Sequence, residues 1–214
     1  MPAPAIKICG ITSAEALDAA ILAHADYAGF NFFPPSPRFV ATSDAAVLAA
    51  RAQGRIERVG VFVDAADSVI ADAVGAARLD AIQLHGAETP ERAGQLKALF
   101  GLPVWKVISV ASPADIARAQ QFIGAADFIL FDAKTPRGAM LTGGMGLSFD
   151  WALLSTWKGA LPWGLAGGLK PDNVGEAARL TGASLVDTSS GVESAPGVKD
   201  MDKIAAFCKA ARNT

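Results

Sequence analysis

The chain has 214 residues, of which 51% are hydrophobic and 19% charged, and its formal net charge at pH 7 is −2. This length and composition suffice to bury one substantial core, so we expect a single domain over residues 1–214. The small net charge without a long basic run argues against nucleic-acid binding. No apolar stretch approaches the roughly 18 residues of a membrane span, and residues 1–4 lack the features of a secretory signal. We therefore expect a cytoplasmic protein that acts on a small molecule and binds neither nucleic acid nor a membrane.

Eight short β-branched or aromatic runs recur along the chain, and an alanine- and leucine-rich stretch with helical periodicity follows each. The runs begin near Ile6, Tyr27, Glu57, Asp80, Pro103, Asp127, Pro162 and Ser184. Capping signals indicate helix starts at Thr12 or Ser13, Ser43, Ser112 and Pro171. Helical crossovers make the strands parallel. Eight such units match a closed (β/α)8 barrel, the TIM barrel of the α/β class, although an open doubly wound sheet would give the same alternation.

The two cysteines have different settings. Cys208 falls with Ile204, Phe207 and Ala211 at helical spacing, which indicates a small core residue. Cys9 instead ends the first apolar run and precedes a turn. Two cysteines do not make a disulfide framework, so we expect both to be reduced thiols.

Cys9 lies where a barrel carries its chemistry, at the carboxyl end of a strand. Side-chain alternation points Lys7 and Cys9 into the barrel, while Ile6 and Ile8 face the helices. A nearby ammonium increases the thiolate fraction, and a thiolate can serve as a base. The alternative is a buried filler at Cys9 with Lys7 in a structural ion pair, and this run alone does not separate the two.

Asp132 ends the run that begins at Phe128 and shares the inward parity of Leu130. Apolar walls around a carboxyl keep it protonated to higher pH, as a general acid requires. The alternative is a cap or turn residue for the next loop. That stretch, residues 133–147, is rich in glycine, and we interpret it as a mobile cover over the site.

Two glycine-containing segments follow the seventh and eighth expected strands, where barrels of this class frequently bind phosphate. Gly167 and Gly168 form the first, and Ser189, Ser190 and Gly191 form the second. Backbone N–H groups exposed by glycine, with serine hydroxyls, would hold the dianion. One Gly-Gly pair alone would be more typical of a turn, so the prediction rests on the two segments together.

Three further polar residues are candidates for the wall of the site. Arg38 follows a proline-rich loop that would aim its guanidinium at a carboxylate, with a solvent-exposed arginine as the alternative. Gln83 and His85 share inward parity after the fourth strand, as site walls or as satisfied buried groups. Neither His24 nor His85 belongs to a cluster with metal-ligand spacing, so we predict no metal.

Taken together, these residues resemble the phosphoribosylanthranilate isomerases, the barrel enzymes of tryptophan biosynthesis. The matching segments are residues 7–12, 29–32, 36–38, 60–63, 83–86, 131–136, 149–151, 166–174, 187–193 and 196–200. They span nearly the whole chain in family order. The resemblance implies an Amadori rearrangement, in which N-(5-phosphoribosyl)anthranilate, an aminoaldose, becomes the 1-deoxyribulose ketose through an open-chain imine and an enolamine. It implies no cofactor.

The resemblance also assigns roles. It places the general base on Cys9, which removes the C2 proton, and the general acid on Asp132, which protonates the ring oxygen. It assigns phosphate to Gly167, Gly168 and Ser189 to Gly191. Substrate binding falls to Lys7, Arg38 at the anthranilate carboxylate, Gln83, His85 and Asp187, which orients the substrate. A monomer is the commoner form in the family, with a homodimer as the alternative.

Three positions depart from the family pattern: Ala133 and Ala166 stand where a hydroxyl residue is commoner, and Met145 where threonine is usual. A missing hydroxyl beside Asp132 would alter the hydrogen bonding and acidity of that acid. Two other functions compete. A broader isomerase that also acts on the analogous histidine intermediate would need a second acid in place of Cys9. A catalytically silent barrel that senses phosphorylated metabolites would need no acid–base pair.

Overall fold

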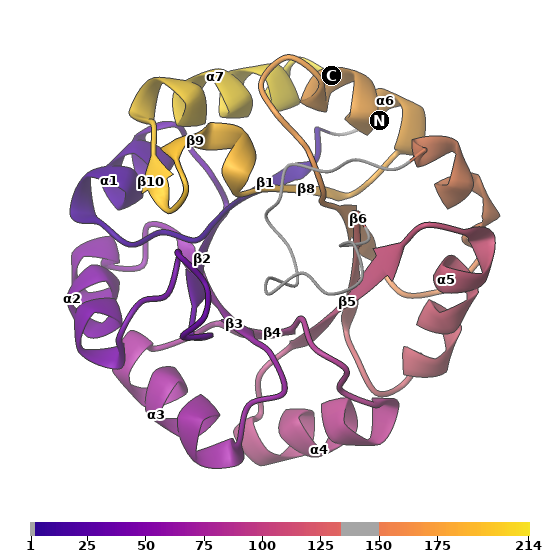
Figure 1. Cartoon of the computed structure of the whole chain (residues 1–214), viewed down its shortest axis with the longest axis horizontal. Helices are drawn as coiled ribbons and strands as arrows, with labels where there is room; N and C mark the ends of the chain where they lie inside the picture. Colours follow the sequence, from indigo (N-terminus) through magenta and orange to yellow (C-terminus); the bar gives the residue numbers. More distant parts are fainter. Residues whose placement is uncertain (1–2, 134–149) are drawn as a thin grey trace.

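The computed structural model describes residues 3–133 and 150–214, and its centre is a closed barrel of eight parallel strands in the order of the chain (Figure 1). The strands are β1 (Ala5–Cys9), β2 (Tyr27–Asn31), β3 (Glu57–Phe62), β4 (Ala81–Leu84), β5 (Val104–Val110), β6 (Phe128–Ala133), β7 (Trp163–Leu165) and β8 (Leu185–Thr188). Each begins within one residue of its expected start. The barrel closes because β1 pairs with β8, with Lys7 opposite Asp187, which excludes the open sheet.

Seven α-helices of the described residues surround the barrel (Figure 1). They are α1 (Ala14–Leu22), α2 (Thr42–Ala52), α3 (Asp67–Ala77), α4 (Pro90–Phe100), α5 (Pro113–Ala117), α6 (Val174–Thr181) and α7 (Met201–Arg212). Three 3-10 helices, η1 (Arg118–Phe122), η2 (Trp151–Thr156) and η3 (Ser190–Val192), and a ribbon of β9 (Glu193–Ala195) and β10 (Val198–Lys199) complete the fold. No helix in this part of the chain is long and apolar enough to cross a membrane.

Two of the described helical stretches differ from a regular α-helix. After β5, the short α5 continues as η1, and between residue 150 and β7 the chain forms only η2. In η2 the Ser155 hydroxyl donates to Ala152 O and the Thr156 hydroxyl donates to Leu153 O, each at 2.7 Å. Such side-chain bonds compete with the regular helical ladder, which favours a short, tight turn here.

The helix starts follow local chemistry at two of the four predicted places. Ser13 caps α1, and Ser112 forms a capping box with Asp115 at α5. The helix expected from Ser43 begins one residue earlier, without a side-chain cap. The helix expected near Pro171 begins only at Val174, because the preceding residues form a turn.

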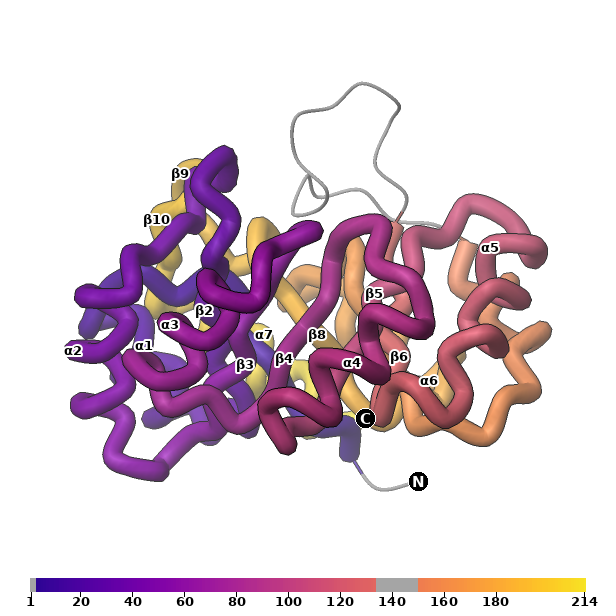
Figure 2. The backbone as a smooth tube through the Cα atoms, turned by 90° about the horizontal axis from the view of Figure 1, so that it is seen from below, coloured from indigo at the N-terminus to yellow at the C-terminus, as the bar shows by residue number. Residues whose placement is uncertain are grey.

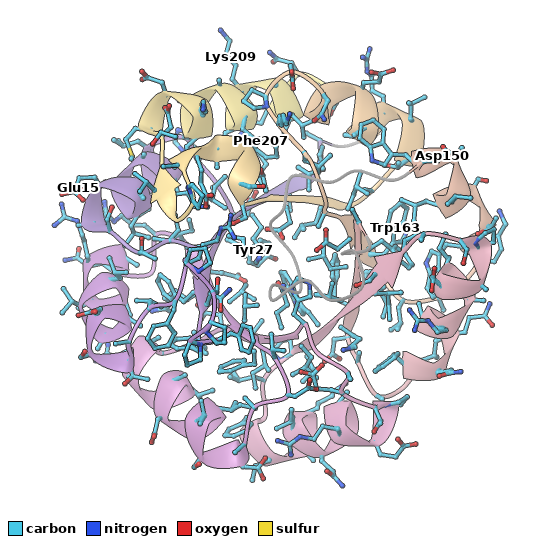
Figure 3. The ribbon with its side chains drawn as sticks, viewed as in Figure 1. Glu15, Tyr27, Asp150, Trp163, Phe207 and Lys209 are labelled. Carbon is cyan, nitrogen blue, oxygen red and sulfur yellow. The ribbon has the colours of Figure 1, made fainter. Side chains whose placement is uncertain are left out.

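The core has two layers, inside and outside the barrel. Ile6 and Ile8 belong to the outer layer between strands and helices, as their parity predicted, and so does Cys208 on α7. Figure 3 shows Phe207 of the same helix at this layer, with Lys209 on the outer surface. The inner layer comprises Val59, Ala81, Trp105, Val107, Leu130, Ala166 and Leu185, with Tyr27 and Phe128 packed against it. The barrel is therefore a filled core, and the polar inward residues gather at the carboxyl ends of the strands.

Candidate active site

A buried ion pair joins β1 to β8 inside the barrel. Lys7, which is fully buried, donates from Nζ to Oδ1 of Asp187 at 3.0 Å. Burial alone would lower the pKa of Lys7, but the charges of Asp187 and Cys9 outweigh it and raise that pKa above its usual value. Lys7 is therefore a fixed cation. The pair with Asp187 agrees with the alternative that Lys7 belongs to a structural ion pair. The Lys7 ammonium also lies beside Cys9, however.

Cys9 is partly exposed at the end of β1, and its sulfur shares a small space with the Lys7 ammonium. The opposite residue on β2 is Gly29, where a Cβ would lie 3.0 Å from Cys9 Sγ and 3.1 Å from Lys7 Nζ. Burial raises the pKa of the Cys9 thiol above its usual value, while the nearby Lys7 and Lys199 ammonium groups lower it. Lys7 thus acts in the expected direction, towards a larger thiolate fraction, while burial opposes it.

Asp132 is buried at the end of β6, where its Oδ1 accepts from Ala133 N at 2.8 Å. Its Oδ2 lies 3.3 Å from Nε2 of His85. The sequence predicted apolar walls around this carboxyl, and the structure adds a histidine, because β4 and β6 lie on either side of β5 in the barrel. His85 Nε2 makes no hydrogen bond within the described residues, so the contact is one of proximity.

Asp187 connects the two halves of the site. Burial raises the pKa of Asp187 above its usual value, Lys7 opposes this, Asp132 adds to the rise and His85 opposes it. Cys9 at the end of β1 and Asp132 near the end of β6 both lie on the carboxyl side of the barrel, where the Lys7–Asp187 pair joins β1 to β8.

The structure brings the two glycine segments together. Gly167 and Gly168 have φ angles of 86° and 66°, in the left-handed region that glycine adopts without a side-chain clash. A Cβ at Gly167 would lie 2.4 Å from Ala133 N, so this loop passes directly over the end of β6. A Cβ at Gly191 would lie 1.9 Å from Leu169 O, so the second segment touches the first. Only glycine permits this approach at Gly191, and the two segments form one continuous surface at the ends of β7 and β8.

Ser189 has a role that the sequence did not predict. Its hydroxyl donates to Cys9 O at 3.0 Å and accepts from Lys199 Nζ at 3.2 Å. Ser190, which begins η3, and Gly191 stay half-buried. Ser189 therefore ties the predicted phosphate segment to the strand end that carries the candidate base.

Arg38 is buried, so the solvent-exposed alternative is wrong. Its Nε lies 2.7 Å from Oε1 of Glu193, and its Nη2 donates to Oε2 at 2.8 Å. Lys199 donates to the same Oε1 at 2.8 Å. Sequence reasoning missed Glu193 and Lys199. The signal available was the Pro196–Gly197 turn between them, which predicts a hairpin with the two residues opposite each other, as in the β9–β10 ribbon.

Gln83 and His85 occupy different depths. Gln83 is almost fully buried between Val61 and Trp105 in the strand register, and its Oε1 has no partner within residues 3–133 and 150–214. His85 is partly exposed, at the mouth of the barrel. The structure therefore supports a wall position for His85, with Gln83 below it.

Some predictions fall elsewhere. Met145 and the cover loop beyond Ala133 lie outside the described residues. Ala133 and Ala166 are both buried beside the site. Among the described residues, no group of three histidine, cysteine or acidic side chains is placed to hold a metal ion.

Known proteins are similar to this chain in sequence and in fold. The family model described as N-(5'phosphoribosyl)anthranilate (PRA) isomerase matches residues 6–210. An N-(5'-phosphoribosyl)anthranilate isomerase from Paramagnetospirillum magneticum is 55% identical over 207 residues, which cover 97% of this chain and 96% of the relative. The crystal structure of mutually generated monomers of dimeric phosphoribosylanthranilate isomerase from Thermotoga maritima matches with a TM-score of 0.83 and 35% identity, over 99% of this chain and 100% of that one. A phosphoribosyl anthranilate isomerase in complex with reduced 1-(o-carboxyphenylamino)-1-deoxyribulose 5-phosphate matches with a TM-score of 0.84 and 32% identity, over the same shares of both chains.

Proposed function

Since the chain belongs to the N-(5'-phosphoribosyl)anthranilate isomerase family and is an aldose–ketose isomerase of tryptophan biosynthesis, we propose that Cys9 is its general base and Asp132 its general acid. The observation that supports this assignment is that Cys9 and Asp132 lie at strand ends on the same side of the barrel, with the buried Lys7–Asp187 pair beside Cys9. A sensor without catalysis would need no such pairing of a thiol and a carboxyl.

The proposed reaction moves one proton from C2 to C1 of the sugar. Asp132 gives a proton to the ring oxygen while the C1–O bond breaks, which leaves an open-chain imine. The thiolate of Cys9 then removes the proton from C2, and the resulting enolamine becomes the ketose when C1 gains a proton and the C2 hydroxyl loses one, after which Asp132 is reprotonated and Cys9 deprotonated for the next cycle. Substrate and product are isomers, so the sequence balances without an oxidant or reductant.

Lys7 supports the proposed base. A thiolate at Cys9 would lie beside the ammonium, so its charge would be compensated when the proton leaves for the reaction. Asp187 in turn keeps Lys7 charged and oriented. His85, 3.3 Å from Asp132, is proposed to contact the substrate and the acid from the β4 side.

The two anionic ends of the substrate would bind on either side of β1. Arg38, from the loop after β2, is proposed to hold the anthranilate carboxylate. Gly167, Gly168 and the segment from Ser189 to Gly191 are proposed to hold the phosphate through backbone N–H groups. Because β8, β1 and β2 are neighbours in the barrel, Cys9 lies between these two ends.

We propose a monomer in solution. The exposed apolar side chains of the described residues, such as Leu22, Val47, Leu99 and Leu180, lie on separate helices, as is usual for scattered surface residues. Light scattering would test this, and a homodimer mass would contradict it. The cytoplasmic location expected from the sequence stays a prediction, which cell fractionation would test.

The proposed catalytic pair is tested by following the loss of fluorescence of freshly made phosphoribosylanthranilate. The Cys9→Ser and Asp132→Asn variants should each lose about 100- to 10,000-fold in kcat, the usual contribution of general acid–base groups. The matched control is Cys208→Ala, which removes the other thiol from the outer core and should keep kcat. Wild-type kcat in both site variants would reject the assignment.

A further inference from the structure

Three charged side chains form a buried cluster beside β1, outside the proposed acid–base pair. Oε1 of Glu193 is shared between Arg38 Nε at 2.7 Å and Lys199 Nζ at 2.8 Å. The three side chains are only 6%, 5% and 1% exposed, in the order Arg38, Glu193, Lys199. Buried charges of this kind need good geometry to be tolerated, and the bidentate contact with Arg38 provides it.

The carboxylate of the cluster is held ionised by its two basic partners. Burial alone would raise the pKa of Glu193, but hydrogen bonds and charges from Arg38 and Lys199 lower it below its usual value, so the carboxylate is ionised at neutral pH. Burial in turn lowers the pKa of Lys199, and the Glu193 carboxylate opposes this. Glu193 therefore influences both the position and the charge of its basic partners.

From Glu193 the contacts continue to the phosphate segment and to the base. Lys199 Nζ donates to Ser189 O at 2.9 Å and to its hydroxyl at 3.2 Å. The Ser189 hydroxyl then donates to Cys9 O at 3.0 Å. A single carboxylate thus connects the arginine proposed for the substrate carboxylate with the segment proposed for the phosphate.

The backbone supports this connection through the β9–β10 ribbon, which rises beside the loop after β2 at the barrel mouth (Figure 2). Glu193 and Lys199 are opposite each other in the ribbon. Its turn residue Gly197 has a φ of 82°, and a Cβ there would lie 2.4 Å from Pro37 O. The ribbon therefore packs directly against the residue that precedes Arg38, and both parts are held at a fixed separation.

We propose that Glu193 is a positioning residue that sets the distance between the Arg38 guanidinium and the phosphate segment at Ser189, a role that rests on the binding assignments proposed above. Glu193 acts through its two cationic partners. Holding both anion-binding ends at the spacing of the substrate before binding lowers the cost of ordering them, which favours ligands that carry both charges.

The test compares three ligands on the full-length enzyme. The first is phosphoribosylanthranilate, the second is its aniline analogue, which lacks the carboxylate, and the third is inorganic phosphate as a competitive inhibitor. In Glu193→Gln the KM for phosphoribosylanthranilate should rise about tenfold while kcat stays within about twofold, because uniform binding is lost. The preference for the carboxylate-bearing substrate should fall about tenfold, and the Ki of phosphate should rise several-fold.

Single-end variants separate positioning from general damage. Arg38→Met should lose the carboxylate preference and keep the phosphate Ki, whereas Lys199→Met should raise the phosphate Ki and keep the preference. In the Arg38→Met background, Glu193→Gln should cause no further loss of preference, since contacting residues are not additive. Asp80→Asn is the matched control, because Asp80 forms a bidentate pair with Arg58 at the opposite end of the barrel. It should keep both readouts.

A Glu193→Gln enzyme with wild-type preference and wild-type phosphate Ki would overturn the proposal, and so would a loss confined to kcat. If Glu193→Gln does not fold, the Lys199→Met variant tests the proposal. An unchanged phosphate Ki in Lys199→Met would reject the link from Glu193 through Lys199 to the phosphate segment. Failure of the proposed binding assignments is a different result, namely an Arg38→Met enzyme that keeps the wild-type preference for the carboxylate-bearing substrate. An active wild type with an unaffected Glu193→Gln rejects only the positioning role.

Discussion

At the amino end of the barrel, Asp26, Asp80 and Asp127 precede β2, β4 and β6, and each accepts a backbone N–H from a neighbouring strand. At the carboxyl end, charged side chains form buried pairs instead. Lys7 binds Asp187, and Lys199 binds Glu193. The amino-end acids stay half-buried or exposed. Exposed or half-buried acids that cap strands cost little to desolvate, whereas buried charges are expensive.

The difference shows where the molecule concentrates its costly interactions. Below the site, Trp105 packs between Tyr27, edge to face, and Phe128, at a tilt, with ring centroids 5.1 and 4.9 Å apart, and fills the amino end with apolar surface. Above it, ionisable groups replace apolar ones in the same barrel. In this fold, residues at the amino end of the barrel are expected to contribute mainly to stability, and residues at the carboxyl end mainly to catalysis. Three measurements test whether this division holds here.

The largest expected effect is on stability, from Trp105→Ala. Removing this buried ring should lower the free energy of unfolding by about 3–5 kcal/mol, measured by urea denaturation. In the folded fraction, kcat/KM should stay within about threefold, because the ring lies at the other end of the barrel. Leu22→Ala, at an exposed position, is the control and should change neither quantity. A tenfold loss of kcat/KM in folded Trp105→Ala would break the division between the two ends.

The next effect concerns the thiol, in Lys7→Met made on a Cys208→Ala background. Burial raises the pKa of Cys208 to about 11. The Cys208→Ala substitution removes this second thiol, so that only Cys9 is alkylated. Without the Lys7 ammonium, alkylation of Cys9 should shift to higher pH, and kcat near neutral pH should fall at least about tenfold. Lys106→Met is the matched control, since Lys106 forms an equally buried pair with Glu88. An unchanged alkylation profile in Lys7→Met would show that Lys7 serves stability only.

The smallest effect is the pH dependence of stability, with opposite signs at the two ends. The pKa of Glu193 is lower in the folded chain, so its stabilisation is present above the unfolded value of about 4.3 and is lost as the pH falls through the folded pKa. Glu57, at the amino end, has a pKa raised by burial and by Asp80 and Asp26. Glu193→Gln should therefore destabilise at pH 7, and Glu57→Gln should slightly stabilise.

Both differences from the wild type should shrink towards pH 3, where the carboxyls are protonated in the folded and unfolded chains. Urea unfolding of the two variants and the wild type between pH 3 and pH 7 measures this. If both variants changed the free energy of unfolding in the same direction at pH 7, the two ends of the barrel would not differ in whether they stabilise an ionised carboxylate.

Much of the scaffold was predictable because its signals are local. The strand starts, the inward parity of Lys7, Cys9 and Asp132, and the cap at Ser13 depend on residues a few positions apart. The fifth and sixth units were not predictable in the same way. Their apolar spacing fits a helix, but in the fifth unit α5 ends after five residues and continues as η1, and in the sixth the hydroxyl groups of η2 bond to its own backbone.

The sequence by itself determined the alternation of strands and helices, the family, and the thiol and carboxyl at strand ends. Only the tertiary structure decided their partners, because Lys7 and Asp187 are 180 residues apart and Arg38 and Glu193 are 155 apart. Periodicity and capping act within one element, so they can be read along the chain. An ion pair between distant strands exists only after the barrel closes, and so does the burial that raises the pKa of Cys9.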